Sequence, residues 1–161
     1  MLNIKRIFNN EVITNEGITN EYNRIVFTNG CFDILHPGHI RLLKFCKSFN
    51  YPVIVGLNTD NSIKMIKPNR PINNFKFRYE MISAIKYVKY IIPFDQKSPI
   101  ELIKILKPKI LVKGMDWIDK ENDECFDYIL SYGGEVIFYD SNLDISTTKI
   151  INFIKNTENI S

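Results

Sequence analysis

Five short runs of largely apolar residues recur along this chain, and they constrain its fold more than any other feature. The runs lie at 25–29, 52–57, 90–94, 110–113 and 135–139. Short apolar runs of this kind are typical of strands buried on both faces, which occur in parallel sheets that helices cover on either side. The sequence therefore predicts an α/β fold with a Rossmann-like, doubly wound, five-stranded parallel sheet.

Helical patterns separate these runs. We expect helices at 38–49, 75–88, 98–107, 123–132 and 146–155, and a short helical turn at 62–66. Ser98, Pro99 and Glu101 have the spacing of an N-cap, a first helical residue and a capping box, so the third helix is expected to begin there. Gly133-Gly134 predicts the end of the fourth helix. Ligands of such sheets bind beyond the carboxyl ends of the strands, where the strand order reverses.

Length and composition predict one globular domain. The chain has 161 residues, of which 45% are hydrophobic and 24% are charged. We expect a lead-in segment at 1–24 and a single domain at 25–161. No apolar run approaches the length of a membrane span, the N-terminus lacks the apolar core of a signal peptide, and the three cysteines are widely separated. These features predict a cytoplasmic protein with no membrane partner.

Positive charge is concentrated in one part of the chain. The net charge is +3 overall, whereas residues 58–90 contain seven cations and two anions. The cations are Lys64, Lys67, Arg70, Lys76, Arg78, Lys86 and Lys89. Such a segment suits an anionic ligand, although most of these lysines could equally form a solvated surface. A nucleic-acid-binding module is disfavoured, because the chain has no recognised binding signature and no strongly basic overall charge.

The two histidines of the chain lie together. His36 and His39 follow the first apolar run and stand at the start of a helix, separated by Pro37-Gly38. Residues three apart on a helix point to the same side, and a helix N-terminus offers free N–H groups to an anion. This arrangement predicts a phosphate site. One histidine could instead only cap the turn; a zinc site is disfavoured, because no third ligand has suitable spacing.

The run TNGCFDILHPGH at 28–39 resembles the HxGH nucleotidyltransferase (cytidylyltransferase-like) superfamily. The similarity continues in VGLNTDNSIKMIKPNRPI at 55–72, in the long block 77–117 and at 133–151. The chain is most similar to the D-glycero-β-D-manno-heptose 1-phosphate adenylyltransferase domain. It is also similar to glycerol-3-phosphate cytidylyltransferase, especially in DISTTKI.

The resemblance implies a reaction in which an NTP and a phosphorylated sugar give an NDP-sugar and pyrophosphate. ATP and heptose 1-phosphate are the favoured substrates. The alternative is a CTP-dependent enzyme acting on glycerol 3-phosphate or another polyol or amino-alcohol phosphate. Mg²⁺ is expected to arrive with the NTP, held mainly by phosphate oxygens and water, so no metal-binding residue is named. The resemblance also implies a homodimer.

Site residues are implied by position within the matching blocks. The expected catalytic residues are His36, His39 and Lys67. The expected nucleotide-binding residues are Thr28, Asn29, Gly30, Cys31, Phe32, Arg78, Ser146, Thr147 and Thr148. The expected acceptor-binding residues are Asp33, Lys64, Lys113, Asp116 and Trp117. Three of these have plain structural alternatives: Lys67 as a solvent lysine, Ser146 as an ordinary N-cap and Trp117 as a packing residue.

The chain departs from the heptose enzymes near the expected acceptor site. Met115 stands where they usually have a second glycine, and 123–126 replaces an Ile-Val-Gly-like segment. Asp144 stands where a glycine is common. These departures leave the reaction as expected and make the acceptor the open question.

Overall fold

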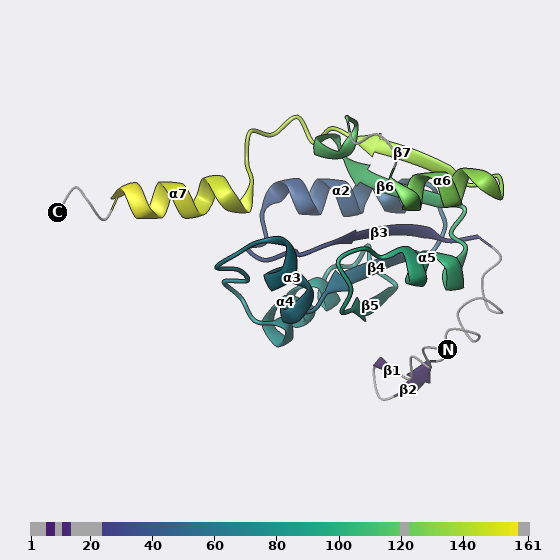
Figure 1. Ribbon diagram of the computed structural model, residues 1–161, viewed down its shortest axis with the longest axis horizontal. Helices are drawn as coiled ribbons and strands as arrows, with labels where there is room; N and C mark the ends of the chain where they lie inside the picture. The colour runs from purple at the N-terminus through teal and green to yellow at the C-terminus, as the bar shows by residue number, and fades with distance from the viewer. Residues whose placement is uncertain (1–5, 9–10, 14–23, 120–122, 158–161) are drawn as a thin grey trace.

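The computed structural model describes residues 6–8, 11–13, 24–119 and 123–157. Its core is a five-stranded sheet in which every neighbouring pair is parallel, in the order β5-β4-β3-β6-β7 (Figure 1). The strands are β3 (Val26–Gly30), β4 (Val53–Asn58), β5 (Tyr90–Phe94), β6 (Ile110–Gly114) and β7 (Glu135–Tyr139). The predicted fold class is confirmed, and each strand lies within about one residue of its predicted apolar run.

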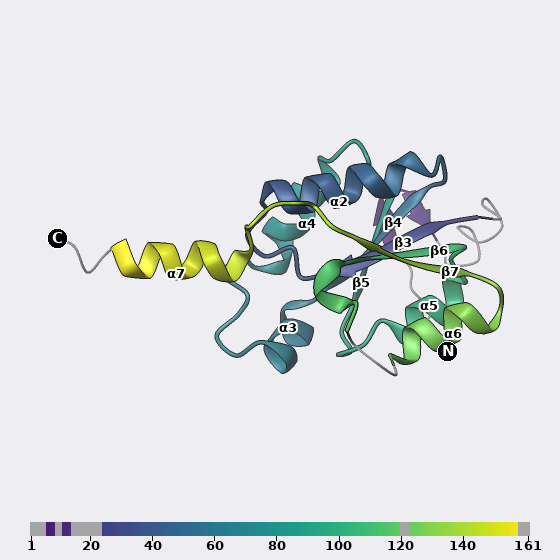
Figure 2. The ribbon, with the colours of Figure 1, turned by 90° about the horizontal axis from the view of Figure 1, so that it is seen from above.

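Helices connect the strands and cover both faces of the sheet. They are α2 (Pro37–Ser48), α3 (Asp60–Ile66), α4 (Phe75–Ser83), α5 (Ile100–Leu106), α6 (Glu124–Ser131) and α7 (Thr147–Thr157), with a 3₁₀ turn, η1 (Met115–Trp117). Figure 2 shows α2 and α4 on one side of the sheet and α5 and α6 on the other. The side chains along each strand therefore alternate between two apolar cores.

The two cores explain why the strands are apolar along their whole length. Phe27 points into the core beneath α5 and α6, where it joins Ile103 and Ile129. Its neighbour Val26 points the opposite way, into the core beneath α2 and α4 with Leu43. All five side chains are 0% exposed, so both faces of the sheet are covered at its centre, whereas the edge strand β7 is only partly buried.

One helix is shorter than its sequence pattern predicts. The expected helix 75–88 ends at Ser83, and the chain then makes two tight turns, with hydrogen bonds from Ile85 N to Ile82 O and from Val88 N to Ile85 O. These turns lead directly to the edge of the sheet, where Lys89 N donates to Val53 O. The apolar period of 85–88 therefore reflects packing of the turns rather than helix.

The start of α5 also differs from its prediction. The helix begins at Ile100, with Pro99 as the residue before it, so Ser98 is not the N-cap. Ser98 Oγ still accepts a hydrogen bond from Ile100 N at 3.4 Å. Glu101 does not complete a capping box, because its carboxylate binds Lys104 Nζ at 2.8 Å.

The end of α6 agrees with its prediction. Gly133 has φ +79° and its N–H donates to Leu130 O, while Gly134 N donates to Ile129 O. This pair of bonds is a Schellman motif, which needs a left-handed residue and therefore favours glycine at its first position. The glycine pair turns the chain directly into β7.

Two described parts of the chain, one near each terminus, lie apart from the five-stranded sheet. Within the lead-in predicted at 1–24, the structure describes an antiparallel pair, β1 (Arg6–Phe8) and β2 (Glu11–Ile13), and residue 24; the rest lies outside the described residues. At the other end α7 extends away from the sheet and has no buried residue (Figures 1 and 2). No helix in the described part of the chain combines the length and apolarity that a membrane span requires.

The strand order creates one natural place for a ligand. The chain runs outward from β3 through β4 to β5, and then returns to the other side of β3 to form β6 and β7. The order therefore reverses between β3 and β6. At such a switch point the connections leave in opposite directions and open a crevice beyond the carboxyl ends of the strands.

Candidate active site

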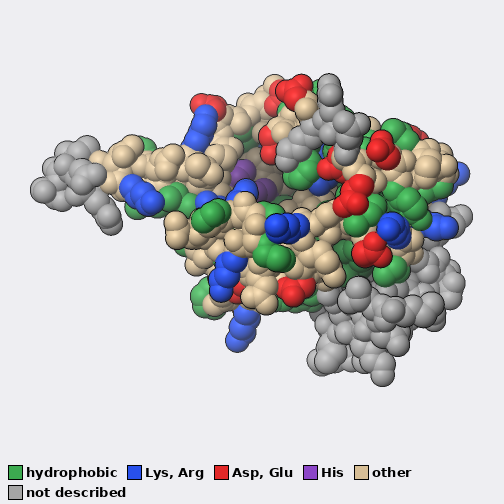
Figure 3. Space-filling model, in the orientation of Figure 1, with side chains coloured by type: hydrophobic (Ala, Val, Ile, Leu, Met, Phe, Trp, Pro, Cys, Tyr) green, Lys and Arg blue, Asp and Glu red, His purple; other side chains and the backbone are tan. Residues whose placement is uncertain are grey.

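A cavity of about 560 Å³ lies at this switch point. It is hollowed into the face of the molecule near the start of α7, and Figure 3 shows the histidine side chains inside it. Fourteen of the predicted site residues line it: Asn29, Gly30, Cys31, Phe32, Asp33, His36, His39, Lys67, Lys113, Asp116, Trp117, Ser146, Thr147 and Thr148. Residues from four separate segments of the chain thus converge on one cavity.

The two histidines form a stacked pair at the start of α2. Their ring centroids are 3.7 Å apart, with 27° between the ring planes. His36 is the N-cap, and its backbone N–H donates to His39 Nδ1 at 3.3 Å. Because Nδ1 of His39 accepts a hydrogen bond, neutral His39 carries its proton on Nε2. The prediction that both rings share one side of the helix start is confirmed.

Burial makes both imidazoles poor bases. It lowers the pKa of His39 to about 3, with further contributions from the nearby His36 and Lys67. It also lowers the pKa of His36. Both rings are therefore neutral in the free protein at pH 7. His36 Nδ1 is buried and has no hydrogen-bond partner among the described residues.

Gly38 lets the histidine pair approach the backbone closely. A Cβ atom at this position would lie 3.0 Å from Cε1 and Nδ1 of the His36 ring and 3.7 Å from Ser141 Oγ. A contact at 3.0 Å is tighter than ordinary van der Waals packing, so a Cβ here would require the His36 ring to shift by a few tenths of an ångström. The glycine is needed for the space it leaves rather than for its backbone angles.

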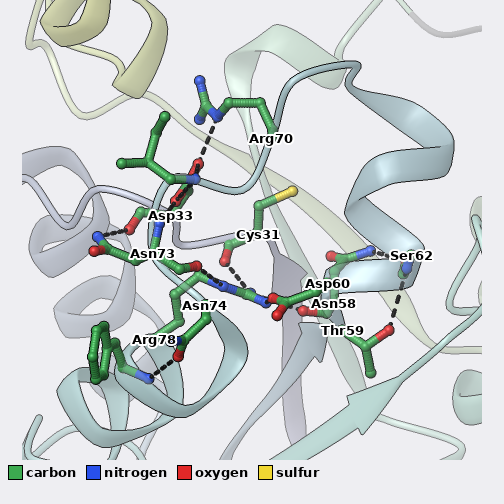
Figure 4. A network of polar contacts seen from close by, with 12 residues as sticks. Cys31, Asp33, Asn58, Thr59, Asp60, Ser62, Arg70, Asn73, Asn74 and Arg78 are labelled. Atoms are coloured by element: carbon green, nitrogen blue, oxygen red, sulfur yellow. Dashed lines mark hydrogen bonds and ion pairs between the residues drawn. The ribbon is translucent and has the colours of Figure 1, made fainter.

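Asp33 is buried beneath the cavity wall and holds the segment that follows Lys67. Its carboxylate accepts hydrogen bonds from the backbone N–H groups of Ile72 at 2.9 Å and Asn73 at 2.8 Å. Arg70 Nε donates to the same carboxylate at 2.5 Å (Figure 4). The side chain of Asp33 is 1% exposed. Its carboxylate is thus engaged in positioning the loop that contains Arg70, Ile72 and Asn73.

Arg78 lies below the cavity instead of lining it. Its guanidinium donates to three backbone carbonyls, Cys31 O at 2.7 Å, Asn58 O at 2.8 Å and Asn73 O at 3.0 Å, and it pairs with Asp60 at 2.8 Å (Figure 4). The side chain is 0% exposed. Arg78 was predicted to bind the nucleotide, but its fully buried side chain does not line the cavity. Its hydrogen bonds hold three loops together.

Two other predicted residues also lie outside the cavity lining. Thr28 is 1% exposed within β3, and its Oγ1 has no hydrogen-bond partner among the described residues. Lys64 is exposed on α3. Both were implied by their positions within the matching blocks, and neither lines the cavity.

Lys113, Asn29 and Trp117 form one wall of the cavity. Lys113 Nζ donates to Asn29 Oδ1 at 2.7 Å and lies 3.9 Å from the centroid of the Trp117 ring. Gly114 makes room for this arrangement, because a Cβ there would lie 2.6 Å from Asp116 Oδ1. A cation, a carboxylate and a flat ring side by side suit a phosphorylated, hydroxyl-rich ligand.

The start of α7 forms another part of the cavity lining. Ser146 Oγ accepts from Lys149 N at 3.2 Å, so its predicted role as an N-cap is confirmed. Thr147 Oγ1 donates to Ile34 O at 3.3 Å, which ties the helix start to the segment beside Asp33. The N–H groups of this first turn are available to an anion in the cavity.

The three departures from the heptose enzymes fall at different places. Met115 lines the cavity and is 39% exposed, whereas 123–126 forms the first turn of α6. Asp144 forms an ion pair with Lys149 at the start of α7. The first two of these departures therefore change the cavity lining, through Met115 in one case and through Asp123 and Cys125 in the other.

Several lining residues were not among the predicted site residues. They are Leu42, Asn58, Arg70, Lys97, Ser98, Asp123, Cys125, Tyr139, Asp140 and Ser141, among others. Arg70 was counted only as part of the basic segment, although its place three residues after Lys67 could have singled it out. Burial raises the pKa of the Cys31 thiol. No three His, Cys, Asp or Glu side chains gather into a metal-binding cluster among the residues described.

Comparison with known proteins agrees with this geometry. The bifunctional protein HldE of Gluconobacter oxydans is 40% identical over 129 residues, which cover 80% of this chain and 27% of that protein. HldE of Helicobacter pylori is 41% identical over 145 residues, which cover 89% of this chain and 30% of that protein. The chain therefore spans less than a third of the length of these curated relatives.

A solved structure and a family model give the same result. The crystal structure of a lipopolysaccharide core biosynthesis protein from Thermoplasma volcanium superposes with a TM-score of 0.59 at 28% identity, over 71% of this chain and 94% of that one. The model of the cytidylyltransferase-like family matches residues 27–153, the segment that contains the sheet, the histidine pair and the start of α7. The resemblance seen in the sequence is confirmed: the chain belongs to the cytidylyltransferase-like family.

Proposed function

We propose that this protein transfers a nucleotidyl group from an NTP to a sugar phosphate, and that ATP and heptose 1-phosphate are its substrates. The observation that carries the proposal is the neutral, stacked pair of His36 and His39 at the start of α2, inside the cavity. Similarity to HldE proteins and to a lipopolysaccharide core biosynthesis protein supports the choice of sugar phosphate. CTP with glycerol 3-phosphate or a related phosphate is the second candidate, supported by the family match.

The acceptor phosphate supplies the nucleophile in this reaction. One of its oxygens attacks the α-phosphorus of the NTP, a new P–O bond forms, and the bond from the α-phosphorus to the bridging oxygen breaks to release pyrophosphate. The acceptor is already an anion, so no side chain needs to remove a proton from it. The protein contributes alignment and stabilisation of the charge that spreads over the phosphate oxygens.

The histidine pair is suited to that task. His39 can donate from Nε2, and its neutral state in the free protein means that the nearby phosphates would raise its pKa and strengthen its hydrogen bonds as negative charge develops. Lys67 adds a cation close enough to His39 to contribute to the lowering of its pKa. The first turn of α7 adds backbone N–H groups and the hydroxyls of Thr147 and Thr148.

The wall formed by Lys113, Asp116 and Trp117 is the proposed acceptor side. Lys113 would pair with the phosphate of the acceptor, Asp116 would accept hydrogen bonds from its hydroxyls, and Trp117 would pack against the ring. Met115 makes this wall more apolar than a glycine would. Mg²⁺ would enter with the NTP and neutralise its phosphates, held by phosphate oxygens and water.

Pyrophosphate release tests the proposal. Four NTPs are combined with phosphorylated heptose, glycerol, ribitol and ethanolamine, and product is identified by mass. ATP with heptose 1-phosphate is expected to give ADP-heptose; CTP with glycerol 3-phosphate as the productive pair would establish the second candidate. The absence of pyrophosphate from every combination would refute the transferase.

The proposal extends to assembly and location. Resemblance to the family supports a homodimer in the cytoplasm. Light scattering on the purified protein would measure the mass in solution, and a mass of one chain at micromolar concentration would contradict the dimer. Cell fractionation tests the location.

A further inference from the structure

Arg70 is the lining residue whose geometry says most about how the site works. It was not among the predicted site residues, yet it borders the cavity and is 11% exposed. Its Nε donates to Asp33 at 2.5 Å, which fixes the plane of the guanidinium. Its two terminal nitrogens, Nη1 and Nη2, make no hydrogen bond to another described residue. A guanidinium held by one edge therefore offers its other donors to the cavity.

The charge balance around Arg70 favours an anion. The carboxylate of Asp33 is met by two backbone N–H groups in addition to Arg70, so its negative charge is stabilised from within the protein. Lys67 adds a second cation from the same short segment. A planar guanidinium can bind two oxygens of a phosphate at once, which a lysine cannot do.

The sheet order indicates which phosphate this is. In-line displacement at phosphorus puts the attacking and leaving oxygens on opposite sides of the reacting centre. The segment with Lys67 and Arg70 follows β4, whereas Lys113 and Trp117 follow β6, and these strands flank β3 from opposite sides. The histidine pair follows the strand between them. If the β6 side receives the acceptor, the β4 side receives the leaving group.

A hydrogen bond between distant segments supports the same assignment. Thr147 Oγ1 donates to Ile34 O, so the first turn of α7 is attached to the residue next to Asp33. The anchored Arg70 and a helix N-terminus that favours negative charge are thus joined to one two-residue segment, 33–34. They would meet the same end of a triphosphate.

We propose that Arg70 binds the β- and γ-phosphates of the NTP, and hence the pyrophosphate product, and that Asp33 is its positioning residue. The choice of the leaving group rather than the acceptor as the ligand of Arg70 rests on the proposed function, but its test does not require turnover. Pyrophosphate with Mg²⁺ can be titrated into the intact protein by calorimetry, without any acceptor. The binding constant then reports on Arg70 even if no sugar phosphate in the substrate matrix gives product.

The variants are chosen to separate binding from folding. Arg70→Gln is expected to weaken pyrophosphate binding about 10- to 100-fold, because hydrogen bonds to charged groups contribute that much. Arg70→Lys keeps the positive charge but loses the planar guanidinium, so its pyrophosphate affinity should lie between those of the wild type and Arg70→Gln. Asp33→Asn should weaken binding, and should weaken it little further in the Arg70→Gln background, because it acts through Arg70. Lys76→Gln, an exposed lysine of α4 outside the cavity, is the matched control for charge and should bind within about 2-fold of wild type.

Three results would overturn the proposal. The first is a wild-type protein that does not bind pyrophosphate. The second is Arg70→Gln with wild-type pyrophosphate affinity and an unchanged melting temperature. The third is a variant with unchanged pyrophosphate affinity whose KM for the acceptor rises, which would move Arg70 to the acceptor side. If Arg70→Gln does not fold, Arg70→Lys and Asp33→Asn decide the matter by the same titration.

Discussion

The rings of His36 and His39 lie 3.7 Å apart, so neither can take up a proton without bringing a cation against its neighbour. This contact, together with burial, keeps the pair neutral until a phosphate arrives. The site thus has its hydrogen-bond donors in place before the substrate binds. The anion itself creates the conditions under which the donors become stronger.

Replacing His39 tests its part in the chemical step. His39→Ala should lower kcat by about 100-fold or more, because a donor aimed at developing charge contributes on that scale. Rapid-quench measurement of a single turnover separates this loss from product release. Circular dichroism of the variant serves as the control for folding, and a folded variant with a near-wild-type rate would remove His39 from the role.

Acid should destabilise the protein through the same residue. The pKa of His39 is about 3 in the folded protein, against an ordinary value of 6.5. Unfolded chains therefore bind more protons between these values, and the stability that is present above pH 6.5 is lost as the pH falls toward 3. The melting temperature of the wild type should drop more between pH 7.5 and pH 5 than that of His39→Gln. Equal drops would show that His39 does not titrate on unfolding.

Gly38→Ala should separate activity from stability. The added Cβ would meet the His36 ring at 3.0 Å and displace it. We expect kcat to fall about 10-fold or more, since small misplacements of aligned groups are costly. The free energy of unfolding should fall by less than about 0.5 kcal/mol, because alanine is the better helix former. Urea unfolding provides that measurement, and an active Gly38→Ala enzyme would contradict the steric explanation.

Arg78 should be required for folding more than for binding. Arg78→Met removes the partner of three backbone carbonyls in a fully buried position. We expect a loss of about 3–5 kcal/mol in the free energy of unfolding. Asp60 is 34% exposed, so Asp60→Asn should cost no more than about 1 kcal/mol. A similar loss for both variants in urea unfolding would mean that the ion pair, rather than the carbonyl network, carries the effect.

Trp117 provides an optical test of the acceptor wall. It is the only tryptophan in the chain, and Lys113 Nζ lies 3.9 Å from its ring centroid. A sugar phosphate that draws Lys113 toward its own phosphate should change the emission of Trp117. Inorganic phosphate serves as the control for charge alone. Unchanged emission at acceptor concentrations that support turnover would show that the acceptor binds elsewhere.

The fold could be predicted because its signals are local and redundant. Each strand is an apolar run, and the Gly133-Gly134 pair specifies its turn by backbone conformation alone. The prediction of a helix over 75–88 was wrong at its C-terminal end, because the signal there is not specific to a helix. Turns that pack against a sheet also bury residues at helical intervals. Burial sets the pattern, and the pattern does not reveal which local structure produces it.

Some residues of the site could be predicted from the sequence and others could not. His36 and His39 were found because two histidines three residues apart at a helix start have few structural uses. Arg78 could not be assigned from sequence, since a cation that binds carbonyls within the protein and one that binds a ligand look the same in the chain. Arg70 was missed because its importance depends on Asp33, 37 residues earlier. Long-range pairing of this kind appears only in the folded protein.

Pro68 and Asn69 lie between two residues that are fixed by hydrogen bonds, and this affects how tightly a triphosphate can be bound. Lys67 N donates a hydrogen bond to Ile63 O at the end of α3, and Arg70 Nε donates to Asp33. Only two residues lie between these fixed points. Such a short span has little freedom to lose when a ligand arrives. The entropic cost of ordering it is met when the chain folds, so the affinity for phosphate is not reduced by loop closure. The same restraint makes this stretch unsuited to act as a lid.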